Sequence, residues 1–250
     1  MPAVALTDRD GLYGAARFVD ACASVGVRPI LGATLTLDQT VDESSAGARD
    51  VALMRAKMLI NAGIVRGVAE NIAKHAPNAV VIVVSNPLDE MTALTQLATG
   101  FPKARVIGQA GMLDTARFTH FVAETLGVEV GSVRTLTLGS HGDTMVPIWS
   151  SATVAGLPLA QWPGFTPAME REVFEETKTA GATMIKLKGG SGFAVGVSIR
   201  EVVESLLLDS RKVLPVSTLQ QGLYGIRDVC LSVATVVGCG GAREQIEVPI

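Results

Sequence analysis

The chain has 250 residues, 48% of them hydrophobic and 18% charged, with a formal net charge of -3 at pH 7. This length and hydrophobic content are typical of a globular protein with a large core and exclude an intrinsically disordered chain. The lysines and arginines are scattered and are outnumbered by acids, which argues against a nucleic acid partner.

The cysteines and the apolar runs indicate the compartment. Cys22, Cys230 and Cys239 are far apart, odd in number and without metal-binding spacing, which favours a reducing compartment and no structural zinc. No uncharged apolar run approaches the roughly 18 residues of a membrane span, and the first residues lack a secretory leader pattern. We therefore expect a cytoplasmic protein with no membrane partner.

In chain order, the first segment has the pattern of a βαβ unit. Apolar runs at 3–7 and 27–37 predict strands, and residues 11–25 place apolar side chains at helical spacing between them. Residues 2–37, and above all the run ALTDRDGLYG, resemble the start of the PHP domain of bacterial DNA polymerase III alpha subunits. This resemblance implies, as one alternative function, a metal-dependent phosphoesterase or polymerase fragment.

The metal ligands of that motif are not all present here. Arg9 stands where the motif has a histidine, and a permanently charged guanidinium cannot bind a metal ion. Asp8 and Asp10 are then interpreted as a loop and helix-cap pair. We therefore predict no metal site.

The next segment predicts a junction, a helix and a buried strand. The polar stretch 38–50 is interpreted as a loop, and residues 49–75 carry apolar side chains every three or four positions until Pro77. Residues 79–84 (AVVIVV) are typical of a strand buried on both faces of a sheet. The polar run SNPLDE that follows therefore lies at a carboxyl edge, where α/β sheets bind ligands.

The alternation of helices and strands continues to the C-terminus. The pattern predicts helices at 92–99, 114–126, 166–187 and 197–208, strands at 105–108, 133–138, 213–217, 229–237 and 245–248, and strand and turn at 146–159.

Five polar residues at the ends of these elements form a candidate site: Asn86, Asp114, Arg117, His141 and Ser191. A histidine can exchange a proton at neutral pH, and an aspartate that accepts from one ring nitrogen fixes the tautomer and favours the imidazolium form. Arg117, three positions after Asp114, shares its helical face and can bind a carboxylate through two hydrogen bonds. Together they predict acid–base chemistry on a carboxylate-bearing substrate.

From about residue 57 to 250 the chain is similar to the malate and lactate dehydrogenase family, closest to the lactate-dehydrogenase-like malate dehydrogenases of bacteria. The similarity is carried by INAGIVRGVAENIAKHAPNAVVIVVSNPLDEMT, VIGQAGMLDTARF, LGSHGDTMVP and RKVLPVSTLQQGLYGI. It implies that His141 is the proton donor and acceptor, that Asp114 orients it, and that Arg117 and Asn86 bind substrate. The methionine in GDTMVP resembles the malate branch of the family.

The resemblance also implies NAD as cofactor, with contacts from Asn61, Val84 and Asn86. The substrate would be a small 2-hydroxy or 2-oxo dicarboxylic acid, and the protein a homo-oligomer. The fold class is then α/β: a βαβ segment with a junction loop (1–50), an incomplete Rossmann-type parallel sheet (51–108), and a mixed α+β substrate domain (109–250).

Two parts of the family pattern differ in this sequence. No strand, GxGxxG turn and helix occurs, so we expect weak binding of the adenosine half of NAD. The glycines of GCGGAR (238–243) are interpreted as a tight turn. The arginine-rich substrate loop is replaced by AGARDVALMRAKM, in which Arg49 and Arg55 are substitute ligands. A non-catalytic module is therefore the second alternative.

Overall fold

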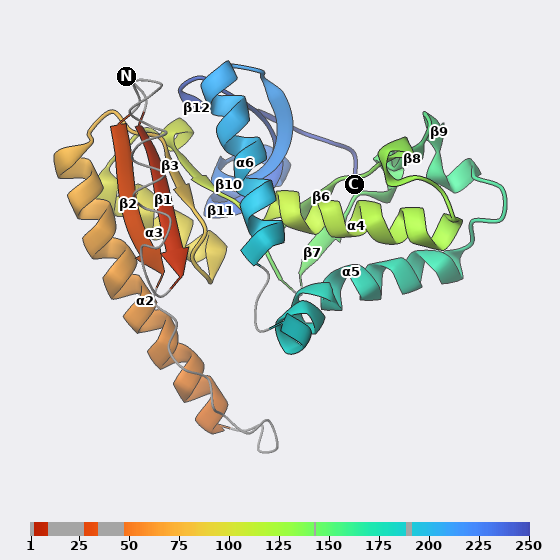
Figure 1. The fold of residues 1–250 in the computed structure, drawn as a ribbon, viewed down its shortest axis with the longest axis horizontal. Helices are drawn as coiled ribbons and strands as arrows, with labels where there is room; N and C mark the ends of the chain where they lie inside the picture. Colours follow the sequence, from red (N-terminus) through yellow and green to blue (C-terminus); the bar gives the residue numbers. More distant parts are fainter. Residues whose placement is uncertain (1–2, 10–27, 35–47, 143, 189–191) are drawn as a thin grey trace.

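The structure is a computed structural model that describes residues 3–9, 28–34, 48–142, 144–188 and 192–250, with side chains described from residue 58 onward apart from Lys188. A seven-stranded mixed sheet runs through the middle of the molecule (Figure 1). Its path is β3 (Val81–Val83), β4 (Val106–Gly108), β10 (Lys212–Gln221), β11 (Arg227–Gly238), β6 (Thr137–Gly139) and β7 (Met145–Pro147), with β12 (Gly241–Ile246) paired to β11.

The predicted α/β fold class with a mixed sheet is confirmed. The sheet contains strands from both predicted segments, 51–108 and 109–250. β3 and β4 are parallel, as a Rossmann-type remnant requires. β4 then pairs antiparallel with β10, so strands before and after residue 108 share one continuous sheet. Within the glycine-rich stretch 238–243, Cys239 and Gly240 form the predicted turn between the antiparallel strands β11 and β12. β12 begins at Gly241, four positions before the predicted start at 245, because the backbone pairing with β11 includes glycine and polar residues that give no apolar signal.

Five helices of the described chain pack around this sheet: α2 (Ala48–His75), α3 (Leu88–Thr99), α4 (Gly111–Leu126), α5 (Pro167–Lys188) and α6 (Gly192–Leu208). All five were predicted, but α3, α4 and α6 begin earlier than the apolar periodicity indicates. Pro87 precedes α3 and Asp89 and Glu90 lie in its first turn, while α4 and α6 both begin at a glycine, so polar residues or glycine interrupt the apolar pattern at these helix starts. Within the described ranges, no helix combines the length and apolarity that crossing a bilayer requires.

The strand predicted at 133–138 is interrupted, whereas the strand and turn predicted at 146–159 are present as several short pieces. Residues 133–138 divide into β5 (Val133–Arg134) and β6, which belong to different sheets. Residues 146–159 contain the end of β7 and then β8 (Thr153–Val154) and β9 (Leu157–Pro158). β5, β8 and β9 form a small antiparallel sheet, so this region is less regular than its apolar sequence suggests.

At the N-terminus, β1 (Ala3–Arg9) and β2 (Arg28–Thr34) form a separate parallel pair, as the βαβ pattern predicts. The predicted helix 11–25, Asp10 and most of the junction lie outside the described residues. Asp8 lies within β1, opposite Ala33, and the interpretation of Asp8 as a loop residue was therefore wrong: the strand continues past the apolar run through Arg9.

A row of small residues crosses the centre of the large sheet. Ser217 of β10 pairs with Gly108 on one side and with Ser232 of β11 on the other, and Ser232 pairs in turn with Gly139 of β6. A Cβ at Gly108 would lie 2.8 Å from the Cβ of Ser217, and one at Gly111 would lie 2.6 Å from the carbonyl of Pro215. The small residues thus let the first turns of α3 and α4 approach the sheet closely.

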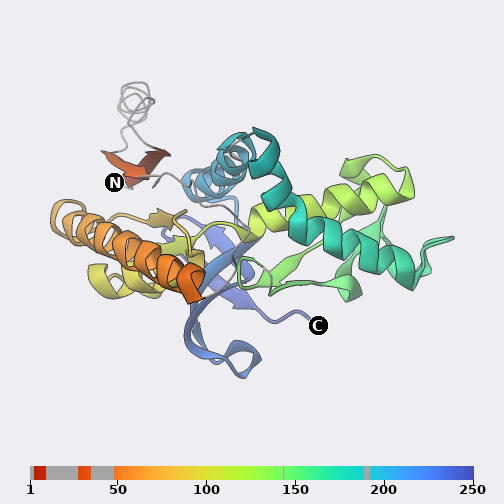
Figure 2. The same ribbon diagram turned by 90° about the horizontal axis from the view of Figure 1, so that it is seen from below.

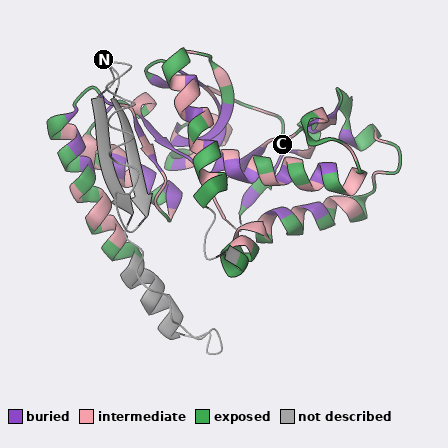
Figure 3. Ribbon diagram, viewed as in Figure 1, coloured by how far each residue is buried: buried purple, intermediate pink, exposed green. Residues whose placement is uncertain are grey.

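Apolar packing holds α4 and α5 together. Phe118 and Val122 of α4 are buried together with Val173 of α5, and Figures 1 and 2 show the two helices side by side. The rings of Phe118 and Trp149 meet edge to face with centroids 4.7 Å apart. Buried residues concentrate where the helices meet the strands (Figure 3). This packing fixes α4 and α5 on two sides of one cavity.

Candidate active site

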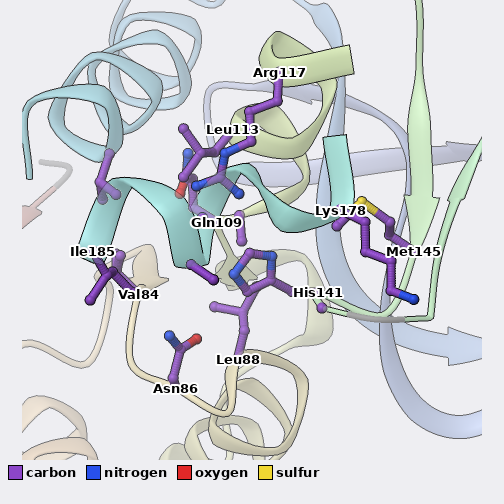
Figure 4. A pocket seen from close by; sticks show the side chains of 15 residues that line it. Val84, Asn86, Leu88, Gln109, Leu113, Arg117, His141, Met145, Lys178 and Ile185 are labelled. Carbon is purple, nitrogen blue, oxygen red and sulfur yellow. The ribbon is translucent and has the colours of Figure 1, made fainter. Parts of the chain in front are cut away.

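A cavity of about 330 Å³ opens where the carboxyl ends of β3 and β4 meet α4, α5 and the turn after β6. Figure 4 shows His141 near its centre, with Arg117, Asn86 and Lys178 at different sides of the ring. Its wall is formed by Val84, Asn86, Leu88, Gln109, Ala110, Leu113, Arg117, His141, Gly142, Met145, Lys178, Gly181, Ala182, Ile185 and Val195. Most of these are apolar, so the polar groups are few and specific.

The imidazole of His141 is held by a buried carboxylate. Nδ1 of His141 lies 2.7 Å from Oδ2 of Asp114, and the Asp114 side chain is only 2% exposed whereas that of His141 is 21% exposed. Because an ionised carboxylate only accepts, the proton of this hydrogen bond resides on Nδ1. Nε2 is therefore the ring atom available to a substrate.

Arg117 shares the same carboxylate. Its Nη1 donates to Oδ1 of Asp114 at 3.1 Å, so one carboxylate binds the histidine through one oxygen and the arginine through the other. The guanidinium also lies against α5 at Gly181, where a Cβ would come within 3.3 Å of two of its nitrogens. Arg117, which the resemblance implies as a substrate ligand, thus pairs with Asp114 and also lines the cavity.

Glycines shape the turn that carries His141. Gly139 and Gly142 have φ values of 88° and 134°, which residues with a side chain rarely adopt. These two glycines therefore let the chain turn on either side of His141.

The backbone of this turn is bound by a carboxylate that the sequence reasoning missed. Oδ2 of Asp89 accepts from the Ser140 hydroxyl at 3.0 Å and from the His141 amide at 3.1 Å. Asp89 lies in the first turn of α3, where acids are common for reasons of helix stability alone. That position gave no signal of a contact with a turn far along the chain.

Asn86 and Asn61 are joined by a hydrogen bond. Asn86 lines the cavity just after β3 and is exposed, and its carbonyl accepts from Nδ2 of Asn61 at 3.0 Å. Asn61, expected at the cofactor, is thus bound to the main chain of the Asn86 loop and is absent from the described cavity wall. Val84, the third expected cofactor contact, lines the cavity.

The remaining predicted site residues are placed less fully. Arg49 and Arg55 lie near the N-terminal end of α2, and their side chains lie outside the described part of the structure. Ser191 also lies outside the described residues. Their expected role in substrate binding stays a prediction.

Two further polar residues line the cavity and were not singled out from the sequence. Lys178 of α5 is partly buried and makes no ion pair with another described residue. Gln109, which follows β4, is 2% exposed, and its Nε2 has no hydrogen-bond partner among the described residues. A buried unpaired amide at a cavity wall suits a ligand with a carboxamide or carboxylate oxygen, so this wall fits the nicotinamide end of a dinucleotide.

Together these groups can perform one kind of chemistry. A histidine with a fixed tautomer can exchange a proton with a hydroxyl or carbonyl oxygen, and the two neighbouring cations can bind carboxylates. Within the described ranges, no group of three or more histidine, cysteine or acidic side chains could hold a metal ion.

Models of one protein family match most of the chain. The lactate/malate dehydrogenase alpha/beta C-terminal domain matches residues 111–250, and the NAD binding domain of the same family matches residues 46–108. A malate dehydrogenase of a Nitratiruptor species is 46% identical over 194 residues, which cover 77% of this chain and 60% of that protein. A malate dehydrogenase of Thermomicrobium roseum is 44% identical over 210 residues, covering 83% of this chain and 67% of that protein.

The likeness extends to solved structures. The malate dehydrogenase from Salinibacter ruber superposes with a TM-score of 0.77 at 35% identity, covering 99% of this chain and 82% of that chain. The match to the Nitratiruptor malate dehydrogenase, by contrast, spans about 60% of the length of that relative. The resemblance of residues 2–37 to a polymerase domain finds no support in these comparisons.

Cys230 of β11 is a buried thiol that is influenced by the charge of Asp89, and its reactivity can be predicted. Burial, and secondly the negative charge of Asp89, raise the pKa of the Cys230 thiol to about 12, whereas Cys239 is exposed. At pH 8 only about one Cys230 in ten thousand then carries the reactive thiolate. We expect iodoacetamide at pH 8 to label Cys239 and to spare Cys230, as measured by peptide mass spectrometry.

Labelling in urea is the control, because unfolding removes the burial and the two thiols should then react alike. Fast labelling of Cys230 in the native protein would contradict the buried environment. The raised pKa of Cys230 also makes the free energy of unfolding depend on pH. Below about pH 8.5 the thiol is protonated in both the folded and the unfolded chain, and there is no effect. As the pH rises from there toward about 12, the thiol ionises in the unfolded chain first, so the free energy of unfolding falls.

Proposed function

Because the chain belongs to the lactate/malate dehydrogenase family, we propose that it interconverts malate and oxaloacetate with NAD, in the manner of the lactate-dehydrogenase-like malate dehydrogenases of bacteria. The observation that carries the proposal is the arrangement around Asp114. One buried carboxylate orients an acid–base histidine and an arginine, and both line the same cavity. The metal-dependent phosphoesterase alternative is not proposed, since neither the matches nor the site supports it.

His141 carries the proton in this mechanism. In malate oxidation Nε2 takes the proton of the C2 hydroxyl, and the C2–H bond gives up its hydrogen as hydride, so that the C2 oxygen becomes the carbonyl of oxaloacetate. NAD, when bound, supplies the hydride acceptor. Asp114 stabilises the imidazolium that forms, because its Oδ2 already accepts from Nδ1 at 2.7 Å. In the reverse direction His141 returns the proton to the carbonyl oxygen.

The cavity walls supply orientation. Arg117 uses one N–H on Asp114, and its remaining donors can hold the C1 carboxylate of the substrate. Val84 and Asn86 lie on the wall where β3 ends, and Gln109 lies where β4 ends. They are the residues that would hold the nicotinamide. Leu88, Leu113 and Met145 are almost fully buried and exclude water from the reacting atoms.

Lys178 favours a dicarboxylate over a monocarboxylate. It lines the same cavity as Arg117, and Figure 4 shows its ammonium on the other side of the His141 ring from the guanidinium. Two cations at separate walls fit a substrate with a carboxylate at each end. We propose that Lys178 binds the second carboxylate, with Arg49, Arg55 and Ser191 as further candidate ligands.

We also propose a cytoplasmic homo-oligomer, with the cofactor side at residues 51–108 and the substrate side at 109–250. The free thiols of Cys230 and Cys239 suit a reducing compartment. Leu59 on α2 is 72% exposed and lies beside Met58 and Ile60, which are 44% and 48% exposed. Large apolar side chains grouped on one helix support a contact between copies.

The activity can be tested directly with Arg117. We expect oxaloacetate-dependent oxidation of NADH, followed by absorbance at millimolar NADH. Arg117→Gln should lower kcat/KM by about 100-fold or more, because the substrate carboxylate loses a charged partner. Arg117→Lys keeps the charge but lacks the planar pair of donors, so its kcat/KM should lie between those of the unmodified protein and Arg117→Gln. An Arg117→Gln enzyme with unchanged kcat/KM would contradict the proposed substrate orientation.

The second carboxylate can be tested with Lys178. Lys178→Gln should raise KM for oxaloacetate by about 10-fold, because an ion pair to the substrate is lost. The rate with a 2-oxo monocarboxylic acid such as pyruvate should stay unchanged. Lys186→Gln is the matched control, since Lys186 is exposed on the same helix and outside the cavity wall. Equal effects of Lys178→Gln on both substrates would overturn the assignment.

The oligomer can be tested with Leu59. Light scattering after size exclusion should give a mass of at least two chains for the unmodified protein, and Leu59→Glu should lower that mass, because a charge in an apolar contact is costly to bury. Glu70→Gln, on an exposed part of the same helix, is the control. A monomeric mass for the unmodified protein, at a concentration where it is active, would refute the homo-oligomer.

A further inference from the structure

Asp89 is a buried carboxylate whose contacts all come from uncharged donors. It is 8% exposed, and no described lysine, arginine or histidine forms an ion pair with it. Oδ1 accepts from the Ser217 hydroxyl at 2.6 Å, and Oδ2 accepts from the Ser140 hydroxyl and from the backbone amide of His141. A carboxylate buried without a cation is unfavourable unless hydrogen bonds replace its water, and here three do so.

The helix that carries Asp89 does not explain this arrangement. α3 also has Glu90 in its first turn, exposed to solvent, and this second acid can interact with the helix dipole without being buried. Asp89 instead reaches across to β10 and to the turn after β6, which lie 128 and 52 positions away at Ser217 and His141. Its contacts therefore belong to the active site and not to the helix end.

The turn at His141 needs an external support. Gly139 and Gly142 on either side have positive φ values and add little stiffness of their own. Asp114 fixes the ring through Nδ1, and the ends of the turn are tied by the pairing of Gly139 with Met145 and by the hydrogen bond from the Met145 amide to the Gly142 carbonyl. None of these contacts holds the main chain at His141 itself. The two hydrogen bonds from Ser140 and His141 to Asp89 fix that main chain.

On the basis of the proposed function, we propose that Asp89 is a positioning residue, which holds the main chain of the Ser140–His141 turn so that the imidazole meets both Asp114 and the substrate. His141 is then held between two carboxylates of different roles. Asp114 binds the ring from α4, and Asp89 binds the backbone from α3. Ser217 orients Asp89 from the central strand β10.

The inference predicts a particular pattern of kinetic defects. Asp89→Asn replaces one acceptor with a donor, so the amide can no longer accept from both Ser217 and the turn. We expect kcat for oxaloacetate reduction to fall by about 10-fold to 100-fold, because small misplacements of a reacting group have effects of that size. KM should change little, because Arg117 and Lys178 remain. Glu90→Gln, the same change of charge one residue away, should leave both constants unchanged.

The pH profile separates positioning from general stability. Oxaloacetate reduction needs a protonated His141, so its rate declines as the pH rises. A ring that no longer meets Asp114 lacks the carboxylate that stabilises its protonated form, so the decline in Asp89→Asn should move to lower pH. The charged groups facing His141 from the packed elements are Asp114 and Arg117 of α4, Lys178 of α5 and Asp89 of α3. A defect of stability alone would lower the melting temperature without moving the profile.

Two further comparisons separate positioning from the direct effect of the lost charge. Ser140→Ala takes away one of the two turn contacts without changing any charge, and it should shift the profile in the same direction by a smaller amount. In an Asp114→Asn background, Asp89→Asn should shift the profile by less than it does in the unmodified protein, because only the direct effect of the lost Asp89 charge remains there. Additive shifts, or an unchanged profile in Ser140→Ala, would overturn the proposal.

An NMR titration keeps this inference separate from the proposed function. The pH midpoint of the His141 Cε1–H signal can be followed without substrate, and it should move in Asp89→Asn and Ser140→Ala as the kinetic profile does. Absence of oxaloacetate-dependent activity in the unmodified protein would refute the proposed function. An unmoved NMR midpoint in both variants would refute the role of Asp89.

Discussion

Asp114 distributes its two carboxylate oxygens between His141 and Arg117, and the rest of the site depends on this division. The carboxylate is 2% exposed, so its charge is compensated by these two partners and not by water. Each partner is thereby oriented toward the cavity, with Nε2 of the ring and the remaining guanidinium donors available to a substrate. In the proposed function, proton transfer and carboxylate binding are therefore coupled through one buried group.

Such an arrangement requires two helix starts close to the sheet. Asp89 and Asp114 lie in the first turns of α3 and α4, and both turns pack over strands whose register aligns Gly108, Ser217 and Ser232. Larger side chains in that row would push the helices outward. The small residues have no chemistry of their own apart from the Ser217 hydroxyl, yet they set the depth at which both carboxylates are buried.

In the proposed function, the cavity wall on α5 determines whether dicarboxylates are preferred over monocarboxylates. α5 packs against α4 through Val173 and Phe118, which places Gly181 beside the Arg117 guanidinium and Lys178 on the same cavity. In the proposed function, this helix therefore supplies the second cation for a substrate with a carboxylate at each end.

The sequence by itself determined the helices, the buried strand at β3 and the residues that resemble the family motif. These follow from local periodicity and from runs of matching residues, which need no knowledge of contacts. It could not indicate the early starts of α3 and α4, because glycine, proline and acids interrupt the apolar pattern. Nor did it separate Asp89 from Glu90, which are neighbours with the same charge on one helix turn. Only the tertiary structure decided that Asp89 is buried against Ser140 and His141, which are 51 and 52 positions away, since burial of a carboxylate depends on which strands and turns the sheet register brings beside it.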